Sequence, residues 1–293
     1  AFTASRYVQN GAGHSALRVG GSLTVESAPV ALPALSVAGN FHADIANSVT
    51  INGAVDIGDG SLQWISGDLF SLNANLSVTG GSLLLQSGSD FTQAAAAEIS
   101  VDDENAVIDS DGAMIVASIN VGTGNLALTA TSDLTQQSAQ LIEASQLRLS
   151  AGGVIGTASD PLTFDVERLS STAGASTFLL SKTALEIDTV AAIDVDTVSV
   201  LGETDNTTLT VDAQSDLSTS ANDGSIILVL DAGNLTLGGG LAGGAENTAV
   251  SANGAGNILL DVAGALTAGA DVLSASGHIS LTAGNNIQFN STA

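Results

Sequence analysis

The sequence predicts an all-β protein whose chain winds into a parallel β-helix, a solenoid with turns of about 21 residues. Three features of the 293-residue sequence support this fold class: short segments of alternating apolar residues, a repeat that keeps one offset in distant regions, and almost no helical periodicity. Together they favour strands that stack on the preceding turn instead of pairing only in hairpins.

The local pattern is an apolar residue, any residue, and a second apolar residue. Alternation over three to five residues is typical of a short strand with one buried face. The best helical candidate, Gln93–Glu98, is too short to be stable on its own. We therefore expect strands wherever the pattern occurs, which includes 23–25, 49–51, 185–187, 193–195, 198–200 and 209–211.

These apolar positions recur 21 residues later in three separate regions. The matching pairs are Val55 and Leu76, Leu62 and Leu83, Trp64 and Leu85, Leu126 and Leu147, Leu134 and Ile155, Ile258 and Ile279, and Leu266 and Ile287. Two intervals differ: Leu35 to Val55 is 20 residues and Leu235 to Ile258 is 23. Each repeat is then one turn lying about 4.8 Å from the next, and the chain has room for about 14 turns.

The repeat also predicts the domain organisation. Because the offset recurs near both ends and in the middle, we expect residues 1–293 to form one continuous β-helix that is a segment of a longer repetitive chain or filament. Residues 202–206 and 239–247 interrupt the pattern and are predicted to be loops that protrude from the turns.

Charge restricts the classes of partner. Thirty acidic residues and five basic residues give a net charge of -25, so the chain cannot neutralise a run of phosphates. Nucleic acid and anionic membrane surfaces are therefore excluded as partners. No run of about 18 apolar residues predicts a membrane helix. The chain begins at Ala1 without a signal-peptide pattern, and we expect a processed product or a piece of a longer protein.

Several segments of the repeat combine apolar residues with Gly, Asn, Ser or Thr at the positions between them. They are Gly124–Ala130, Leu134–Gln136, Leu147–Gly156, Ser159–Leu169 and Gly277–Ile287. The pattern resembles the repeats of filamentous-haemagglutinin-like bacterial surface adhesins. The resemblance implies a right-handed β-helix, export to the cell surface, and a role in adhesion, biofilm formation or self-assembly. It implies no catalytic residues, and the amino-terminal secretion domain of that family is not recognisable in this sequence.

The sequence thus favours a non-enzymatic extracellular rod, either a cell-surface adhesin or a component of a matrix or filament. Its expected partners are further copies stacked head to tail, or glycans or proteins on a host or cell surface. The last repeat, Gly277–Asn290, is highly regular and no capping segment follows it. Either more repeats follow Ala293 or this end stacks on the next subunit, because an open strand edge is a template for pairing.

The alternative is a carbohydrate-active β-helix that binds or cleaves polysaccharides. A lyase uses a basic residue beside acidic groups, and a glycosidase pairs two carboxylates, commonly near aromatic platforms. Five scattered basic residues and 3% aromatic residues argue against both. Trp64 occupies an inward position equivalent to Leu85, so we interpret it as core, whereas Tyr7 is open to either interpretation. A groove lined with Tyr7 or Trp64 beside paired carboxylates would favour the alternative.

One acidic stretch is a candidate metal site. Oxygen-rich side chains that converge in one loop bind Ca²⁺. The spacing fits no known calcium loop, however, so a solvated acidic corner is the competing interpretation. The candidate ligands are Asp102, Asp103, Glu104, Asp109 and Asp111. We predict no catalytic residues and no required cofactor, and the three histidines, His14, His42 and His278, show no metal-ligand spacing.

We expect Ca²⁺ to raise the melting temperature moderately, because a divalent cation screens repulsion within a chain of net charge -25. Thermal unfolding in chelator and in excess Ca²⁺, at matched ionic strength, measures the effect. Equal melting temperatures in the two buffers would contradict the expectation.

Overall fold

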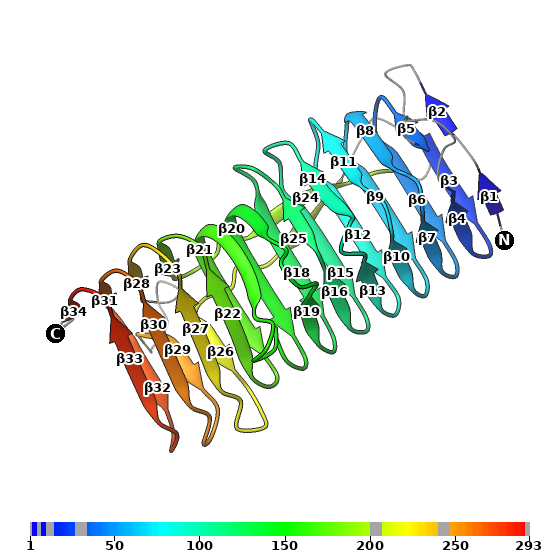
Figure 1. The fold of residues 1–293 in the computed structure, drawn as a ribbon. Helices are drawn as coiled ribbons and strands as arrows, with labels where there is room; N and C mark the ends of the chain where they lie inside the picture. The colour runs from blue at the N-terminus through cyan, green and yellow to red at the C-terminus, as the bar shows by residue number, and fades with distance from the viewer. Residues whose placement is uncertain are drawn as a thin grey trace. The chain divides into compact units, whose positions relative to one another are not determined.

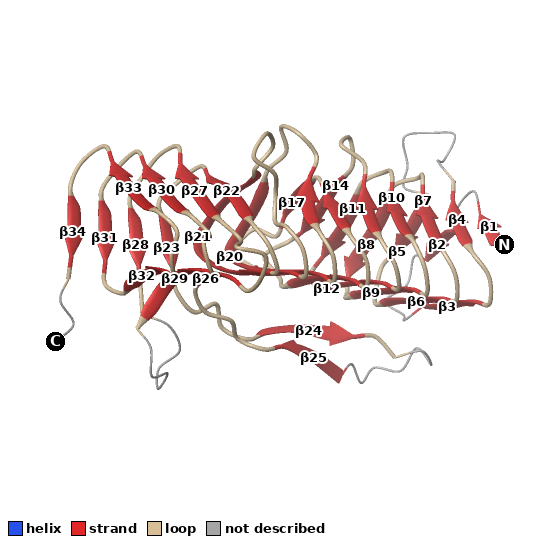
Figure 2. Cartoon of the chain, turned by 90° about the horizontal axis from the view of Figure 1, so that it is seen from below, coloured by secondary structure: helices blue, strands red, loops and turns tan. Residues whose placement is uncertain are grey.

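The computed structural model describes residues 2–4, 7–9, 15–26, 34–199, 207–239 and 247–290, the first two segments by their backbone alone. Within these residues the regular structure consists of β-strands joined by short turns, and no helix is present (Figures 1 and 2). The strands stack in parallel as a β-solenoid of about 12 turns of about 22 residues. The predicted fold class is therefore confirmed, with fewer turns than the predicted number.

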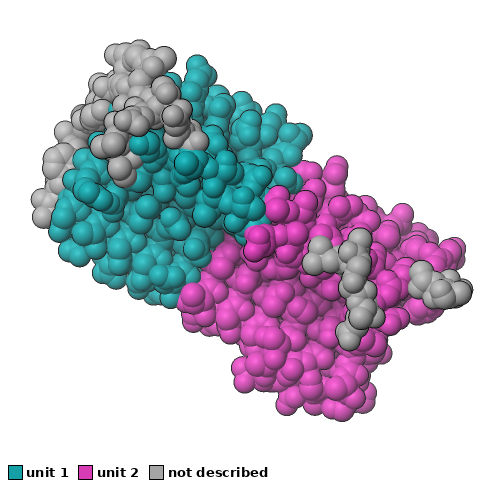
Figure 3. Space-filling view, turned by 180° about the vertical axis from the view of Figure 1, so that it is seen from behind, with its two compact units in different colours: residues 1–127, 193–211 teal, residues 128–192, 212–293 magenta. Residues whose placement is uncertain are grey.

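The structure divides into two compact units, coloured separately in Figure 3. The first unit comprises residues 1–127 and 193–211, and the second comprises residues 128–192 and 212–293. β18 (Asn125–Ala130) contains the division. The expectation of one continuous β-helix stays a prediction.

In the first unit each turn contributes one strand to each of three parallel faces. The first face holds β3 (Ser15–Val19), β6 (Phe41–Ile45), β9 (Leu62–Ser66), β12 (Leu83–Ser87) and β15 (Ala106–Ser110). The second holds β1 (Phe2–Ala4), β4 (Leu23–Val25), β7 (Val49–Ile51), β10 (Phe70–Leu72), β13 (Phe91–Gln93) and β16 (Met114–Val116). The third holds β2 (Tyr7–Gln9), β5 (Leu35–Val37), β8 (Val55–Asp59), β11 (Leu76–Thr79), β14 (Glu98–Val101) and β17 (Ser118–Asn120).

The second unit begins with β19 (Leu134–Gln136) and two long strands, β20 (Ile142–Ala151) and β21 (Leu162–Ala173). Three columns of parallel strands follow. One holds β22 (Thr177–Ser181), β27 (Ile226–Leu230), β30 (Ile258–Val262) and β33 (Ile279–Ala283). The next holds β23 (Leu185–Ile187), β28 (Leu235–Leu237), β31 (Leu266–Ala268) and β34 (Ile287–Phe289). The last holds β26 (Leu217–Thr219), β29 (Thr248–Ala252) and β32 (Asp271–Ser274).

The core is built from inward columns of apolar side chains, as the alternation predicts. Leu62 pairs in register with Leu83 and Trp64 with Leu85, and all four side chains are fully buried. Trp64 makes edge-to-face contacts with Phe41 and Phe70, at ring-centroid distances of 5.8 Å. Its interpretation as a core residue is confirmed, because the ring packs between two neighbouring aromatic side chains instead of facing solvent.

Most of the predicted register is confirmed, and one pairing is wrong. Ile258 lies opposite Ile279, and Leu266 opposite Ile287. Leu235, however, pairs with Leu266 and not with Ile258. This turn contains the long connection between β28 and β29, which shifts the register relative to a regular repeat. Gly239 and Asn247 lie outside strands, as expected for that loop, whereas 240–246 and the predicted loop at 202–206 lie outside the described residues.

Two predicted solenoid strands do not stack on the turns at all. Residues 193–195 and 209–211 belong to β24 (Ile193–Thr197) and β25 (Thr207–Val211), which pair with each other in antiparallel fashion. Val198 and Ser199 are not in a strand, and Val200 lies outside the described residues. A single alternating pattern serves both a solenoid strand and a hairpin strand, because both bury one face. Because β24 and β25 do not belong to the stacked turns, they also help to explain why the turns are fewer than predicted.

We expect Leu85→Ala to destabilise the protein by about 2–5 kcal/mol, because it leaves a cavity in a closely packed inward column. Urea unfolding followed by circular dichroism measures the loss. Gln86→Ala, at the neighbouring outward position, is the matched control and should change stability far less. Similar losses for the two variants would contradict the inward register.

Candidate functional site

The most distinctive local feature of the first unit is the antiparallel hairpin, which we call the arm and define as residues 193–199 and 207–211. Its register pairs Ile193 with Val211 and Thr197 with Thr207. The Thr210 hydroxyl donates to the Asp194 carboxylate at 2.6 Å. Figure 2 shows β24 lying along the face that contains β9 and β12, with β25 outside it.

The arm covers a row of outward side chains on β9, β12 and β15. Gln63, Leu84 and Val107 occupy outward positions on these strands and yet are 8%, 1% and 3% exposed. On the arm, Ile193, Val195 and Val198 are buried in turn. Burial of apolar surface on both sides therefore contributes to docking. The sequence carried a signal for this face, since Leu83-Leu84-Leu85 and Ala106-Val107-Ile108 break the alternation.

Hydrogen bonds fix the arm in place. The backbone N–H of Val198 donates to Gln63 Oε1 at 2.8 Å, and that of Asp196 donates to Ser82 Oγ at 2.7 Å. Asn105 Nδ2 donates to the Asp194 carbonyl oxygen at 2.9 Å. Side chains of the solenoid thus satisfy backbone groups of the arm that no strand pairs, which a docked edge requires.

An open pocket of about 260 Å³ lies beside the docked arm. Three carboxylates line it, and two of them come from the arm. The Ser61 hydroxyl binds one of these, Asp196, at 3.0 Å. The side chains that line the pocket are acidic or polar, so the pocket disfavours anionic ligands. The lining residues are Gly80, Gly81, Ser82, Glu104, Asp194, Asp196 and Thr208.

The candidate calcium ligands lie at two ends of one strand. Asp102–Glu104 form the turn before β15, whereas Asp109 lies within that strand and Asp111 follows it. Five strand residues span about 16 Å, so the two groups do not converge in one loop. Asp103 Oδ1 accepts the Thr123 N–H at 2.8 Å, and Glu104 lines the pocket. Among the described residues, no three His, Asp or Glu side chains are grouped to hold a metal ion. The calcium hypothesis stays a prediction.

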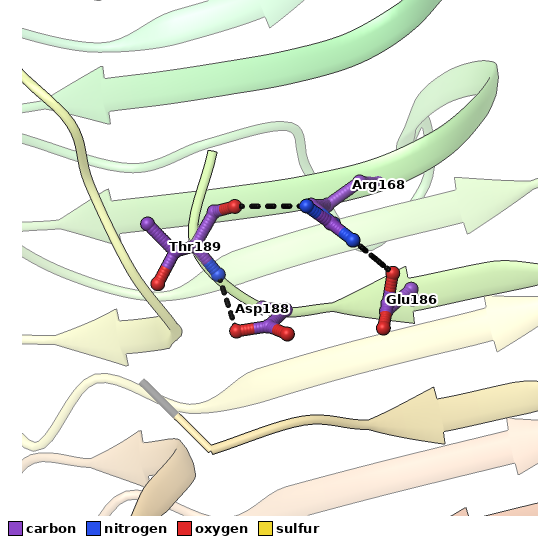
Figure 4. A network of polar contacts seen from close by, with 4 residues as sticks. All are labelled: Arg168, Glu186, Asp188 and Thr189. Carbon is purple, nitrogen blue, oxygen red and sulfur yellow. Dashed lines mark hydrogen bonds and ion pairs between the residues drawn. The ribbon is translucent and has the colours of Figure 1, made fainter. Parts of the chain in front are cut away.

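In the second unit, charged side chains gather where the arm leaves the solenoid (Figure 4). Arg168 donates through Nη2 and Nε to Glu186 Oε2, at 2.6 and 3.0 Å. Its Nη1 reaches the Thr189 carbonyl oxygen at 3.4 Å. The Thr189 N–H donates to Asp188 Oδ1 at 2.7 Å. Arg168 therefore has its carboxylate partner in Glu186.

Asp216 is the most unusual titratable group near this network. Its backbone is in the left-handed region, with φ of 70°, which non-glycine residues rarely adopt. Its Oδ1 atom is buried without a hydrogen-bond partner. Burial raises the pKa of Asp216, and the nearby negative charge of Asp188 raises it further. The sequence offers no signal that brings Asp188 and Asp216 together, because the arm separates the two residues in sequence.

The burial of Trp64 argues against its use as a sugar platform, whereas the interpretation of Tyr7 stays open. Trp64 is buried, and the Tyr7 side chain lies outside the described part of the chain. Comparison with protein-family models, curated proteins and solved structures finds no match to this chain. Nor do the described residues include a helix able to cross a membrane. The class of protein that the structure defines is therefore a β-solenoid with an inserted, docked hairpin.

We expect Val195→Asp to release the arm, because it places a charge against the apolar row on β12 and β15. The chain has no cysteine, so a Leu84→Cys background reports release through the rate of thiol labelling. Leu85→Cys, one residue away and facing inward, should stay protected. Ala213→Asp adds the same charge at an exposed position and should leave Leu84→Cys protected. Equal labelling in the Val195→Asp and Ala213→Asp backgrounds would contradict docking.

Proposed function

We propose that this chain is a non-enzymatic extracellular solenoid, an adhesive or structural component of a bacterial cell surface, matrix or filament. We further propose that it self-associates through its open strand ends. The β-solenoid fold is compatible with such a role. The resemblance to filamentous-haemagglutinin-like repeats supports the proposed location, which is secreted or at the cell surface.

The observation that best supports this proposal is the unpaired strand edge of the second unit. In the described residues, β32, β33 and β34 each have a strand partner on one side only. Core-type side chains are consequently exposed there: Phe289 is 68% exposed, Ile279 45% and Ile287 40%. Unpaired parallel edges with exposed apolar side chains form a template for a further turn of solenoid. The occupant that we propose is a second copy of this chain.

The distribution of charge supports contact between ends. Residues 1–25 contain no acidic residue and include Arg6 and Arg18, whereas residues 262–293 contain only Asp271. The other 29 acidic residues lie between these segments. Two copies of a chain with net charge -25 repel one another, and repulsion is smallest where acidic residues are fewest.

An outward column of hydroxyl groups supports the adhesive part of the proposal. On β4, β7, β10 and β13 the outward residues are Thr24, Thr50, Ser71 and Thr92, which lie in register on successive turns. Thr92 Oγ1 donates to Ser71 Oγ at 3.2 Å. Such a column repeats the same donor and acceptor at each turn, and it offers a polar surface to glycans or proteins.

We expect the chain to form concentration-dependent oligomers, and the double variant Ile279→Lys with Ile287→Lys to abolish them. Lysines at these inward positions place charges on the open edge. Sedimentation velocity and electron microscopy measure assembly. The control, Ser280→Lys with Gln288→Lys, adds the same charges at outward positions of the same strands and should assemble. A monomeric wild-type chain at high concentration, or equal assembly of the two double variants, would overturn self-association through this end.

A further inference from the structure

The arm has an outer edge that no described strand covers. β24 contacts β9, β12 and β15, and in the described residues β25 pairs only with β24. Figure 2 shows β25 on the side of β24 that faces away from β9 and β12. Thr207, Thr208 and Thr210 of β25 are exposed, and Leu209 is half-buried. The outer edge of β25 is therefore open to solvent within the described part of the chain.

The contacts of the inner edge determine which backbone groups lie on the outer edge. The Asp194 carbonyl oxygen and the N–H groups of Asp196 and Val198 all bond side chains of the solenoid. These residues occupy alternate positions of the arm, so their backbone groups face away from β25. In an antiparallel pair, opposite residues alternate between pairs that exchange hydrogen bonds and pairs that do not. Asp194 and Asp196 thus belong to pairs without such bonds, and their partners are Thr210 and Thr208.

The partners of these two aspartates direct their own backbone groups outward. Thr208 and Thr210 make no backbone bond to β24 in this pattern, so their N–H and C=O groups point to the outer edge of β25. Leu209, between them, uses its backbone groups to pair with Val195. Each of the two threonines therefore offers one donor and one acceptor to a further antiparallel strand.

The outer edge lacks the features that commonly protect a sheet edge. Edge strands are often shielded by charged side chains, by proline or by a bulge. β25 has the sequence Thr-Thr-Leu-Thr-Val, without charge or proline, and its register with β24 is continuous. Its threonine and valine residues favour the extended conformation. In a chain of net charge -25, a neutral strand is also a place where a second copy meets little direct repulsion.

The outer edge is complementary to the same edge of a second copy. Two identical antiparallel strands pair well only when residues with outward backbone groups lie opposite one another. A pair centred on Leu209 places Thr208 opposite Thr210 of the second copy, and Thr210 opposite Thr208, so each pair exchanges both backbone bonds. Leu209 then lies opposite its own equivalent. Contacts between the leucines, and between the threonines on the other face, add to the stability of the sheet.

We propose that the outer edge of β25 is a lateral contact site for a second copy of this chain. The two arms pair about Leu209 into one four-stranded sheet, in the order β24-β25-β25-β24. A hairpin alone is marginally stable, and further strands stabilise it. The contact is isologous, so it closes as a two-fold dimer and does not propagate. It uses none of the residues of the open edge at β32, β33 and β34, and it therefore goes beyond the proposed stacking of ends.

Disulfide formation between single cysteines tests the register. The chain has no cysteine, so a disulfide in a single-cysteine variant joins two copies. In the dimer the two Leu209 Cα atoms lie about 4.5 Å apart, which a disulfide spans, whereas the two Thr208 residues are diagonal neighbours at about 7–8 Å. We expect Leu209→Cys to form covalent dimers at least about tenfold faster than Thr208→Cys under the same oxidant.

The exposure of the two positions makes this comparison decisive. Thr208 is more exposed than Leu209, so random collision favours Thr208→Cys and predicts the opposite order. Ala213→Cys, at an exposed position outside the arm, gives the rate of random collision. Equal rates for Leu209→Cys and Ala213→Cys, or a faster rate for Thr208→Cys, would overturn the proposal.

Proline at position 208 tests the backbone contact. Thr208→Pro removes an N–H of the outer edge and keeps the bonds between β24 and β25, and edge strands tolerate proline at such positions. In the Leu209→Cys background it should slow cross-linking to the rate of Ala213→Cys. Thr208→Val removes the hydroxyl but keeps the N–H, and it should leave cross-linking fast. An unchanged rate in Thr208→Pro would refute pairing through this edge.

Sedimentation velocity separates the arm contact from the stacking of ends. In the double variant Ile279→Lys with Ile287→Lys, the arm contact should still give a concentration-dependent dimer, and adding Thr208→Pro should give a monomer. A monomer before that addition would overturn the arm contact, whereas failure of stacking through the ends leaves the dimer unchanged. If the double variant fails to fold, cross-linking of Leu209→Cys and Thr208→Cys in the otherwise unchanged chain decides the question.

Discussion

The parallel pairing of each turn with the next is the interaction on which the rest of the structure depends. It satisfies the backbone hydrogen bonds of very short strands, which are not stable individually, and it places like residues above one another. The consequence is a core of columns, in which Trp64 lies on Leu85 and Phe70 on Phe91. Because each turn depends on a neighbour for pairing and burial, an end turn without one exposes the same side chains that are buried elsewhere, as Phe289 does.

Stacking also determines what the surface can do. Inward positions are committed to packing, so functional variety is confined to outward positions and to insertions between strands. The first unit uses both. Its outward hydroxyl column is a repetitive surface, whereas Gln63, Leu84 and Val107 form an apolar row that the arm covers. The acidic pocket exists only because the arm brings Asp194 and Asp196 beside Glu104. An inserted hairpin thus creates local features that a regular solenoid lacks.

The segment that contains the arm is inserted without disturbing the solenoid. Leu169 and Ser171 keep their partners in the following turn, so the inward columns continue past the insertion. The strain and the unmatched charge lie instead in Asp216 and Asp188, outside those columns. Self-association through the end and release of the arm depend on different residues and can be tested separately.

Alternation and the 21-residue offset by themselves determined the fold class, the inward register and the burial of Trp64, because these depend on short-range periodicity that stacking preserves. They did not determine which alternating segments leave the solenoid: Ile193-Asp194-Val195 reads like Leu185-Glu186-Ile187, yet only the second joins a turn. Tertiary structure alone decided which segment covers Leu84, that the predicted calcium ligands divide between two corners, and that Asp188 lies near Asp216. The physical reason is that pairing of distant segments depends on which surfaces are left to bury, and local sequence does not encode that choice.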